Sequence, residues 1–269
     1  MSITVSSRRN PLVREYQKLL QSRRHRHKLK KIALEGPNLV REALKSGLIP
    51  EVVFFTKKYS ETGGSEWLSE LPAEVMQVVL AESVFTGIAD TKTPQAVAAI
   101  MPFNPEKINK SFVESPQLIL ILDRLQDPGN MGSIIRTAAA AGVDLVFYTS
   151  GSVDPYSPKV LRSTAGAIFN LTLELAREPR SVIKALQEKG IKILAACARS
   201  SQQYWSADLK VPIALIIGNE AGGISSEFEA AADIKVSIPL SGSVESLNAA
   251  VAAGVILFEI IRQRNSLST

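Results

Sequence analysis

The sequence is poor in the side chains that hold metals or form disulfides. Its 269 residues include one cysteine, Cys197, and two histidines, His25 and His27. One cysteine excludes an internal disulfide framework and any cysteine-based metal site. Two histidines two residues apart form a poor metal pair on a helix, so we expect no metal cofactor. Cys197 ends the apolar run 193–197, which favours a buried structural thiol over a nucleophile.

Long hydrophobic runs are also lacking. No apolar run reaches the roughly 18 residues that suggest a membrane-spanning helix. The first residues lack the apolar stretch of a signal peptide, so we expect a cytoplasmic protein with no membrane partner. Hydrophobic residues make up 45% of the chain and charged residues 21%, as in globular proteins with a core. A length of 269 residues suits two domains.

Acidic residues are nearly absent from the first 31 positions. This basic arm, residues 1–31, holds ten Lys or Arg against one acid, Glu15, so its formal charge is +9. The chain totals +5, which leaves −4 for all the remaining residues. Such density is typical of a surface that binds phosphates, although a solvated helix face or a flexible tail would look similar. We predict that RNA is contacted by Arg23, Arg24, Arg26 and Lys28. Both histidines are expected on the same surface.

The first hundred residues alternate strand and helix patterns. Apolar spacing of three and four predicts one amphipathic helix over 10–30, with Asn10 as N-cap and Pro11 at its first position. We predict an N-terminal RNA substrate-binding domain over 1–104 and a proline-marked linker over 105–116. Further strands are expected at 32–34, 52–55, 75–79 and 96–100, and further helices at 38–44, around Trp67 and around Val84.

A second pattern of apolar runs begins at Leu118 and defines a second expected domain, 117–269. Near-continuous apolar runs are typical of strands buried on both faces of a parallel sheet. The fold class is therefore α/β. The expected strands are 118–122, 145–148, 191–195, 213–217 and 234–238, and the expected helices lie near 131–141, 180–189, 225–232 and 246–263.

The first of three motifs, Asp127–Gly132, follows the strand at 118–122. Asp127-Pro128 favours a turn and Asn130 can cap the next helix, so a purely structural role is possible. Arg136 lies six residues beyond Asn130 in a small, apolar stretch. A guanidinium buried there would need a partner, and an RNA phosphate is a natural bidentate one.

The second motif is Ile217–Gly223, at the end of the strand 213–217. Its glycines do not fit the G-x-G-x-x-G fingerprint of dinucleotide-binding folds, which disfavours a nucleotide-dependent oxidoreductase. No Gly-Lys-Ser/Thr follows, so the segment is not a P-loop either. Alone it would be only a glycine-rich turn.

The third motif combines Ile238-Pro239-Leu240 with the stretch 245–250, Glu-Ser-Leu-Asn-Ala-Ala. Ser246 is a good N-cap for the last helix by its side-chain chemistry. Asn248 is a poor helix former at the predicted first turn, so its amide plausibly has another use.

In this order, the three motifs resemble those of the SpoU (TrmH-like) branch of the SPOUT RNA methyltransferases. The resemblance covers the last 150 or so residues and implies a parallel-sheet domain with a deep trefoil knot. It also implies methylation of a ribose 2′-hydroxyl from S-adenosylmethionine. The domain over 1–104 resembles the family's substrate-binding domain more loosely, through Leu34–Pro37 and Val40–Ala43.

The resemblance assigns roles to individual residues. Arg136 matches the residue central to catalysis, oriented together with the ribose by Asn130, Glu220, Ser246 and Asn248. The expected domain contains no histidine, and an arginine normally stays charged, so Arg136 is either the base or a clamp on phosphate and oxyanion. The cofactor residues implied are Ala196, Gly218, Ile238 and Leu247.

Substrate and assembly follow from the same resemblance. A separate N-terminal domain favours large-subunit rRNA as the substrate, and a tRNA 2′-O-methyltransferase is the alternative. A non-catalytic RNA-binding or ribosome-assembly protein on the same scaffold is a further alternative. We expect a homodimer, because relatives bury the helices that match the alanine-rich final helix and the helix carrying Arg136 between subunits.

Overall fold

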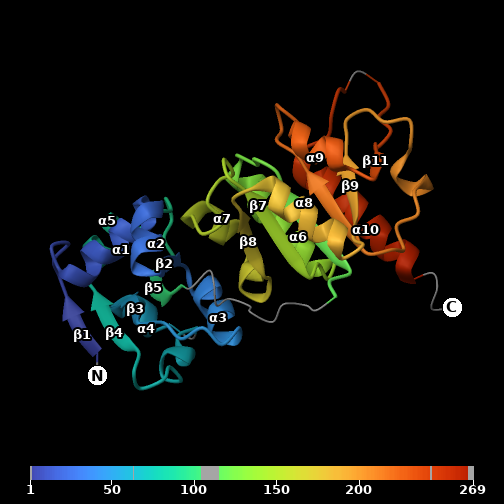
Figure 1. Cartoon of the computed structure of the whole chain (residues 1–269). Coiled ribbons are helices and arrows are strands. Elements are labelled where there is room, and N and C mark those ends of the chain that lie inside the picture. Colours follow the sequence, from blue (N-terminus) through green and yellow to red (C-terminus); the bar gives the residue numbers. More distant parts are fainter. Residues whose placement is uncertain (1, 63, 104–114, 243, 266–269) are drawn as a thin grey trace. The chain divides into compact units, whose positions relative to one another are not determined.

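A computed structural model describes residues 2–62, 64–103, 115–242 and 244–265. Its contacts divide the chain into two compact units (Figure 1). The N-terminal unit comprises 1–105 together with 156–169, and the C-terminal unit comprises 106–155 and 170–269. Residues 156–169 fall within the expected methyltransferase domain, yet their contacts are with the N-terminal unit. The expected linker, 105–116, lies outside the described residues except for Ser115 and Pro116.

The N-terminal unit is built on a mixed five-stranded sheet with the order β1-β4-β3-β5-β2. β1, β4 and β3 run parallel, and β5 runs antiparallel to β3 and to β2. Its strands are β1 (Ser2–Val5), β2 (Lys31–Glu35), β3 (Val52–Thr56), β4 (Met76–Leu80) and β5 (Val97–Pro102). Its helices are α1 (Pro11–Gln21), α2 (Arg23–Leu29), α3 (Pro37–Lys45), α4 (Lys57–Ser60), α5 (Glu82–Ile88) and α7 (Pro158–Ser163), and a 3₁₀ turn covers Glu66–Leu68.

The single helix predicted over 10–30 is wrong, because Ser22 interrupts it. Ser22 has extended backbone angles, φ −126° and ψ 109°, and its hydroxyl accepts from the N–H of His25 at the start of α2. The predicted cap at the other end is confirmed: the Asn10 side chain accepts from the Leu12 N–H at 2.9 Å. The basic arm therefore contains two helices, α1 and α2, with α1 packed on β2.

Arg26 differs from the other cations of the arm. Its side chain is buried, and Nη1 donates to the carbonyls of Leu19 at 2.6 Å and Leu20 at 3.2 Å, at the end of α1. This geometry suits the partial negative charge of a helix C-terminus. His27 packs edge-on against Phe103, with ring centroids 6.1 Å apart. The expectation that these two residues face RNA is therefore corrected, since both have structural roles.

Residues 156–169 join the N-terminal unit through three kinds of contact. The Tyr156 ring lies against Phe103, with centroids 4.0 Å apart. Arg162 pairs with Asp90, with Nη2 at 2.7 Å from Oδ2. Gly166 has a φ of +90°, and a Cβ there would collide with the Glu42 side chain on α3. Only glycine satisfies both conditions, so Gly166 allows close packing of this segment on α3.

The C-terminal unit contains a six-stranded parallel sheet with the order β11-β9-β10-β6-β7-β8. This confirms the predicted α/β class and parallel sheet. The prediction missed β8, a short strand that carries Glu174 among its apolar residues. The elements are β6 (Leu118–Leu122), β7 (Leu145–Thr149), β8 (Leu173–Ala176), β9 (Lys192–Ala196), β10 (Ile213–Ile217), β11 (Ile234–Val236), α6 (Pro128–Ala140), α8 (Pro179–Glu188), α9 (Ser226–Ala231) and α10 (Ala249–Asn265).

Helices cover both faces of this sheet. Leu186 of α8 and Phe228 of α9 share a hydrophobic cluster with Ile121 and Ile216 of the two central strands. α6 and α10 pack against each other, and α10 also contacts β10. Burial on both faces explains why β6 and β10 are continuous apolar runs.

The strand order reverses between β6 and β10, which lie side by side in the middle of the sheet. From β6 the chain continues to β7 and β8 on one side, whereas β9 and β11 lie on the other. Ligands bind to open α/β sheets at such a reversal, beyond the carboxyl ends of the strands. The deep trefoil knot stays a prediction. No described helix is both long and apolar enough to cross a membrane.

Candidate functional site

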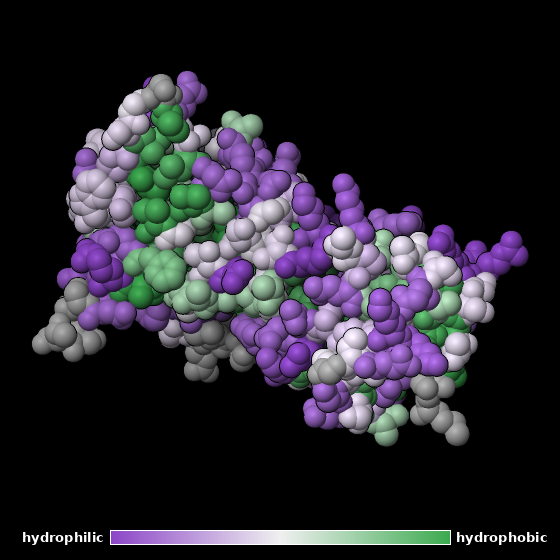
Figure 2. All heavy atoms as spheres, turned by 180° about the vertical axis from the view of Figure 1, so that it is seen from behind, coloured by the Kyte–Doolittle hydropathy of each residue, from purple (hydrophilic) through white to green (hydrophobic). Residues whose placement is uncertain are grey.

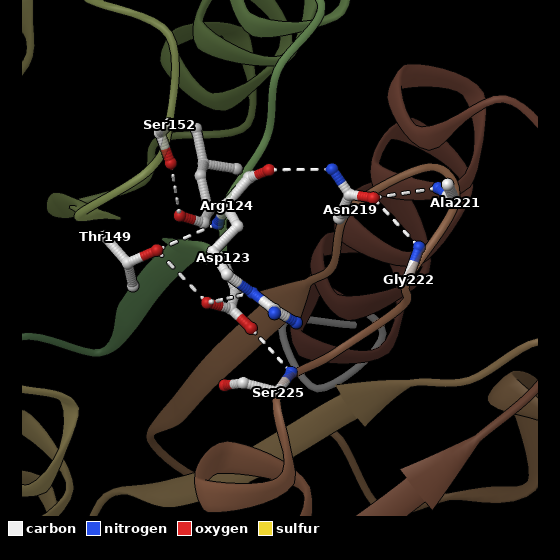
Figure 3. A network of polar contacts seen from close by, with 9 residues as sticks. Asp123, Arg124, Thr149, Ser152, Asn219, Ala221, Gly222 and Ser225 are labelled. Carbon is white, nitrogen blue, oxygen red and sulfur yellow. Dashed lines mark hydrogen bonds and ion pairs between the residues drawn. The ribbon is translucent and has the colours of Figure 1, made fainter.

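A buried carboxylate, Asp123, connects the strand ends at this reversal (Figure 3). It directly follows β6 and is 1% exposed. Its Oδ2 accepts from the N–H of Ser225 at 2.6 Å, and its Oδ1 accepts from the Thr149 hydroxyl at 3.1 Å. These partners satisfy a charge that would be costly to bury alone. Asp123 therefore fixes the loop after β10 to the ends of β6 and β7.

Arg124 continues the network through its backbone. Its φ of +54° is in the left-handed region, which residues other than glycine rarely adopt. Its N–H donates to the Thr149 hydroxyl at 2.8 Å, and its carbonyl accepts from Asn219 Nδ2 at 2.9 Å. Asn219 Oδ1 accepts the N–H groups of Ala221 and Gly222, each at 2.9 Å, as Figure 3 shows. The Asn219 side chain, which the sequence analysis did not single out, thus holds the loop after β10.

Three of the predicted catalytic residues form a hydrogen-bonded chain. Asn248 Nδ2 donates to Asn130 Oδ1 at 2.8 Å, and Asn130 Nδ2 donates to Glu220 Oε1 at 2.7 Å. Asn130 is on α6, Glu220 follows β10, and Asn248 precedes α10. Each motif therefore contributes one member, although up to 118 positions separate them in sequence.

The structure corrects both predicted helix caps at this site. Asp127, not Asn130, caps α6, and its Oδ1 accepts from the Asn130 N–H at 2.7 Å. Asn248, not Ser246, caps α10, and its Oδ1 accepts from the N–H groups of Ala250 and Val251 at 2.9 and 3.4 Å. Capping uses the Oδ1 of Asn248, which leaves its Nδ2 to bind Asn130.

A cavity of about 450 Å³ opens beside this chain. All four residues predicted to bind the cofactor line it: Ala196, Gly218, Ile238 and Leu247. Leu240 and Ile256 add apolar surface, whereas Glu220 and Ser246 add polar groups. An apolar lining with a few polar groups suits S-adenosylmethionine, which combines a flat adenine with a ribose and a charged tail.

Arg136 is apart from the chain and the cavity lining. It lies on α6 with an exposed side chain, so the argument from a buried, unpaired guanidinium is wrong. Small neighbours explain the error, because Ala138 is buried while Ser133 and Ala140 share the exposed side of α6 with Arg136. The Arg136 guanidinium is therefore accessible to a partner outside the chain.

Cys197 also departs from expectation, because it is only partly buried and contributes to the cavity wall. Burial raises the pKa of its thiol, Glu229 raises it further, and Lys235 opposes the rise. A thiol with a raised pKa is a poor nucleophile at neutral pH. Within the described ranges, no three His, Cys, Asp or Glu side chains are grouped to hold a metal ion.

Comparisons with protein families match both halves of the chain. The model of the SpoU rRNA Methylase family matches residues 117–258. The model of an MRM3-like substrate binding domain matches residues 10–99. The chain is 32% identical to the 23S rRNA (guanosine(2553)-2′-O)-methyltransferase RlmP of Bacillus subtilis over 257 residues, which cover 95% of this chain and 98% of that protein.

Two solved structures with S-adenosylmethionine are similar over nearly the full length. The SpoU methyltransferase AviRb from Streptomyces viridochromogenes, in complex with this cofactor, aligns with a TM-score of 0.86 and 26% identity, covering 96% of this chain and 99% of that one. The cofactor-bound rRNA methyltransferase from Sinorhizobium meliloti aligns with a TM-score of 0.83 and 29% identity, covering 97% and 98%.

Gly218 gives a direct test of the cavity. A Cβ at this position would collide with the backbone of Gly223 and Ile224, which cannot move without opening the loop. We expect Gly218→Ala to weaken S-adenosylmethionine binding at least tenfold by calorimetry. Gly222→Ala is the matched control, since its Cβ would lie 3.6 Å from Asn219 Oδ1, an ordinary contact. Equal affinities of the two variants would contradict this assignment of the cavity.

Proposed function

The chain belongs to the SpoU rRNA methylase family, and on that premise we propose that it transfers a methyl group from S-adenosylmethionine to a ribose 2′-hydroxyl of RNA. The observation that carries this function is the Asn248–Asn130–Glu220 chain beside the cavity. A protein that only bound RNA would not need three polar side chains from three distant segments converging there. This is why catalysis is favoured over a non-catalytic assembly role.

The cofactor supplies a sulfonium methyl group that is already activated for transfer. The chain's own residues must then position the ribose, exclude water and accept the hydroxyl proton. Asn130 donates to one oxygen of the Glu220 carboxylate and is itself held by Asn248. Glu220 and Ser246, which line the cavity, then orient the ribose.

Arg136 serves this reaction from the exposed side of α6. A guanidinium carries a permanent charge and five N–H donors in a planar fork, which match a phosphate flanking the target ribose. Whether it also takes the proton is left open, because an arginine normally stays charged.

We expect Arg136→Ala to lower methyl transfer by at least about a hundredfold, the size of effect seen when one transition-state donor is removed. S-adenosylmethionine affinity should change less than twofold, because Arg136 does not line the cavity. Arg136→Lys keeps the charge but loses the fork, and we expect it to be almost as impaired. Arg180→Ala, which removes an 87% exposed arginine on α8, is the control. Near-normal turnover of Arg136→Lys would contradict the clamp.

Large-subunit rRNA is the proposed substrate. The support is the full-length similarity to a 23S rRNA methyltransferase and the match of residues 10–99 to a substrate-binding domain. A tRNA substrate is the alternative. The test is to treat RNA from cells lacking the gene with the protein and to map the methylated positions at nucleotide resolution. Methylation of rRNA but not of tRNA would decide for rRNA. A cytoplasmic location is proposed with this substrate.

The basic helices are proposed to hold the RNA backbone. Arg23, Arg24 and Lys28 are exposed along α2, and Arg14 and Lys18 are exposed one turn apart on α1. Counterion release makes such contacts salt-dependent and largely independent of sequence.

Neutralising Arg23, Arg24 and Lys28 together should raise the apparent KM for RNA and flatten its salt dependence. The log–log slope should fall by up to about 0.9 for each lost duplex contact. Arg26→Ala is the contrasting variant: it should leave the slope unchanged but lower the melting temperature, since it strips two carbonyls of a charged donor. An unchanged slope in the triple variant would make α2 a passive solvated surface.

We propose a homodimer whose interface is the exposed surface of α10. Val251 and Phe258 are 52% and 51% exposed although both belong to a largely apolar helix. Figure 2 shows apolar side chains gathered over this part of the C-terminal unit. Exposed apolar patches of this kind mark interaction surfaces. α6 packs beside α10, so an interface here would also surround Arg136.

Phe258→Asp should convert the dimer to a monomer in light scattering at micromolar concentration. Burying an uncompensated charge costs several kcal/mol, which corresponds to more than a hundredfold in the dissociation constant. Ile49→Asp, at a 43% exposed position of the N-terminal unit, is the control and should leave the mass unchanged. A wild-type monomer under these conditions would contradict the proposal.

A further inference from the structure

A second cavity, of about 410 Å³, lies wholly within the N-terminal unit and shares no lining residue with the cavity beside Glu220. This volume is in the range of roughly 300–1,000 Å³ that small ligands occupy. It opens where β2 passes into α3 through Gly36, whose φ is +99°. Distant segments complete it: the stretch 91–95 after α5, and Arg162 with Ala165 from 156–169.

The floor of this cavity holds a buried charge. Glu35 is 6% exposed, and its carboxylate accepts from the Asp90 N–H at 2.6 Å and from the Thr91 hydroxyl. Asp90 in turn binds Arg162. Glu35, Asp90 and Arg162 are therefore linked in one group, in which Asp90 pairs with the guanidinium and Glu35 accepts the Asp90 N–H, and the formal charge of the group is −1. A carboxylate offers about four lone-pair sites, so Glu35 can accept further donors from a ligand.

Donors and acceptors for a ligand are also present in the lining. Arg162 Nη1 is buried without a hydrogen-bond partner, although Nη2 of the same side chain is paired. No side chain caps the first turn of α3, where Asn38 and Leu39 line the cavity. Exposed amide and hydroxyl groups of Gln95 and Thr93 complete the rim. A buried donor without a partner is costly, so a ligand that accepts from Arg162 would be stabilising.

We propose that this cavity binds one unpaired nucleobase of the RNA substrate, outside the nucleotide that is methylated. The proposal rests on the proposed function for its ligand class. A phosphate would be repelled by the net negative charge of Glu35, Asp90 and Arg162. A base is neutral and carries donors and acceptors on one edge, which match the carboxylate of Glu35 and the guanidinium of Arg162 respectively.

The surroundings of the cavity favour RNA over a free metabolite. Proteins recognise RNA sequence chiefly in single strands, where unstacked bases can be hydrogen-bonded along their edges. α1, with exposed Arg14 and Lys18, packs on β2, the strand that ends at Glu35. Cations beside a pocket that binds a neutral base can hold the flanking phosphates while the pocket selects the base.

The rim residues give a test that spares the fold, because the structure gives Thr93 and Gln95 no hydrogen bond to other described residues. The double variant Thr93→Val and Gln95→Leu keeps shape but removes a hydroxyl and an amide. We expect its dissociation constant for rRNA transcripts to rise roughly tenfold, with melting temperature, S-adenosylmethionine affinity and kcat at saturating RNA unchanged. Thr4→Val, on β1 at the opposite edge of the sheet, is the matched control.

If the double variant binds rRNA transcripts as tightly as a wild type that methylates rRNA, the pocket is overturned and the proposed function stays intact. A second measurement needs no RNA substrate: amide chemical shifts of the full chain titrated with the four nucleosides or with inorganic phosphate. We expect at least one nucleoside to shift Thr91, Thr93 and Gln95, and phosphate to leave them in place. Shifts with phosphate alone, or with none of the probes, would overturn the proposal. A wild type that transfers no methyl group to RNA but shows nucleoside shifts would contradict only the function.

Discussion

The C-terminal unit depends on one buried carboxylate, Asp123. Three chain segments meet at it: the end of β6, Thr149 at the end of β7, and Ser225 beyond β10. Where the strand order reverses, the chain leaves the paired strands β6 and β10 toward opposite sides of the sheet, so the loops beyond them have no sheet hydrogen bonds to hold them together. Asp123 replaces those bonds. The Asn219 loop, and through it Glu220 and the cavity wall, keep their positions because this carboxylate fixes one end of the loop at Ser225 and the carbonyl of the next residue, Arg124, fixes the other at Asn219.

The sequence was most informative where burial is two-sided. The apolar runs at β6 and β10 predicted strands with the bounds that the structure shows, because strands covered on both faces contain little else. The edge strand β11 was predicted from a weaker run, whereas β8, at the other edge, was missed because Glu174 breaks its apolar run. The helix expected over 10–30 failed at Ser22, since apolar spacing cannot show a break when both halves have the same period.

The candidate site was predictable in membership but not in detail. The order of the three motifs led to Asn130, Glu220 and Asn248, which the structure joins by hydrogen bonds. The caps were misassigned because Asp, Asn and Ser are chemically equivalent as caps, and only the backbone decides among them. Asp123 could have been noticed as a charge directly after five buried apolar residues. Nothing local indicated that Arg26 would be buried, since its partners are the carbonyls of another helix.

The excursion of residues 156–169 makes the two units interdependent along the chain. The N-terminal unit takes Tyr156, Arg162 and Gly166 from a segment that is synthesised after β6, α6 and β7. On the ribosome, this unit therefore lacks part of its surface until a third of the following unit has emerged. Its evolution is constrained in the same way. A recombination event at the boundary between residues 105 and 106 would separate α3 from the segment that packs on it, so a unit moved alone would need substitutions at this packing surface.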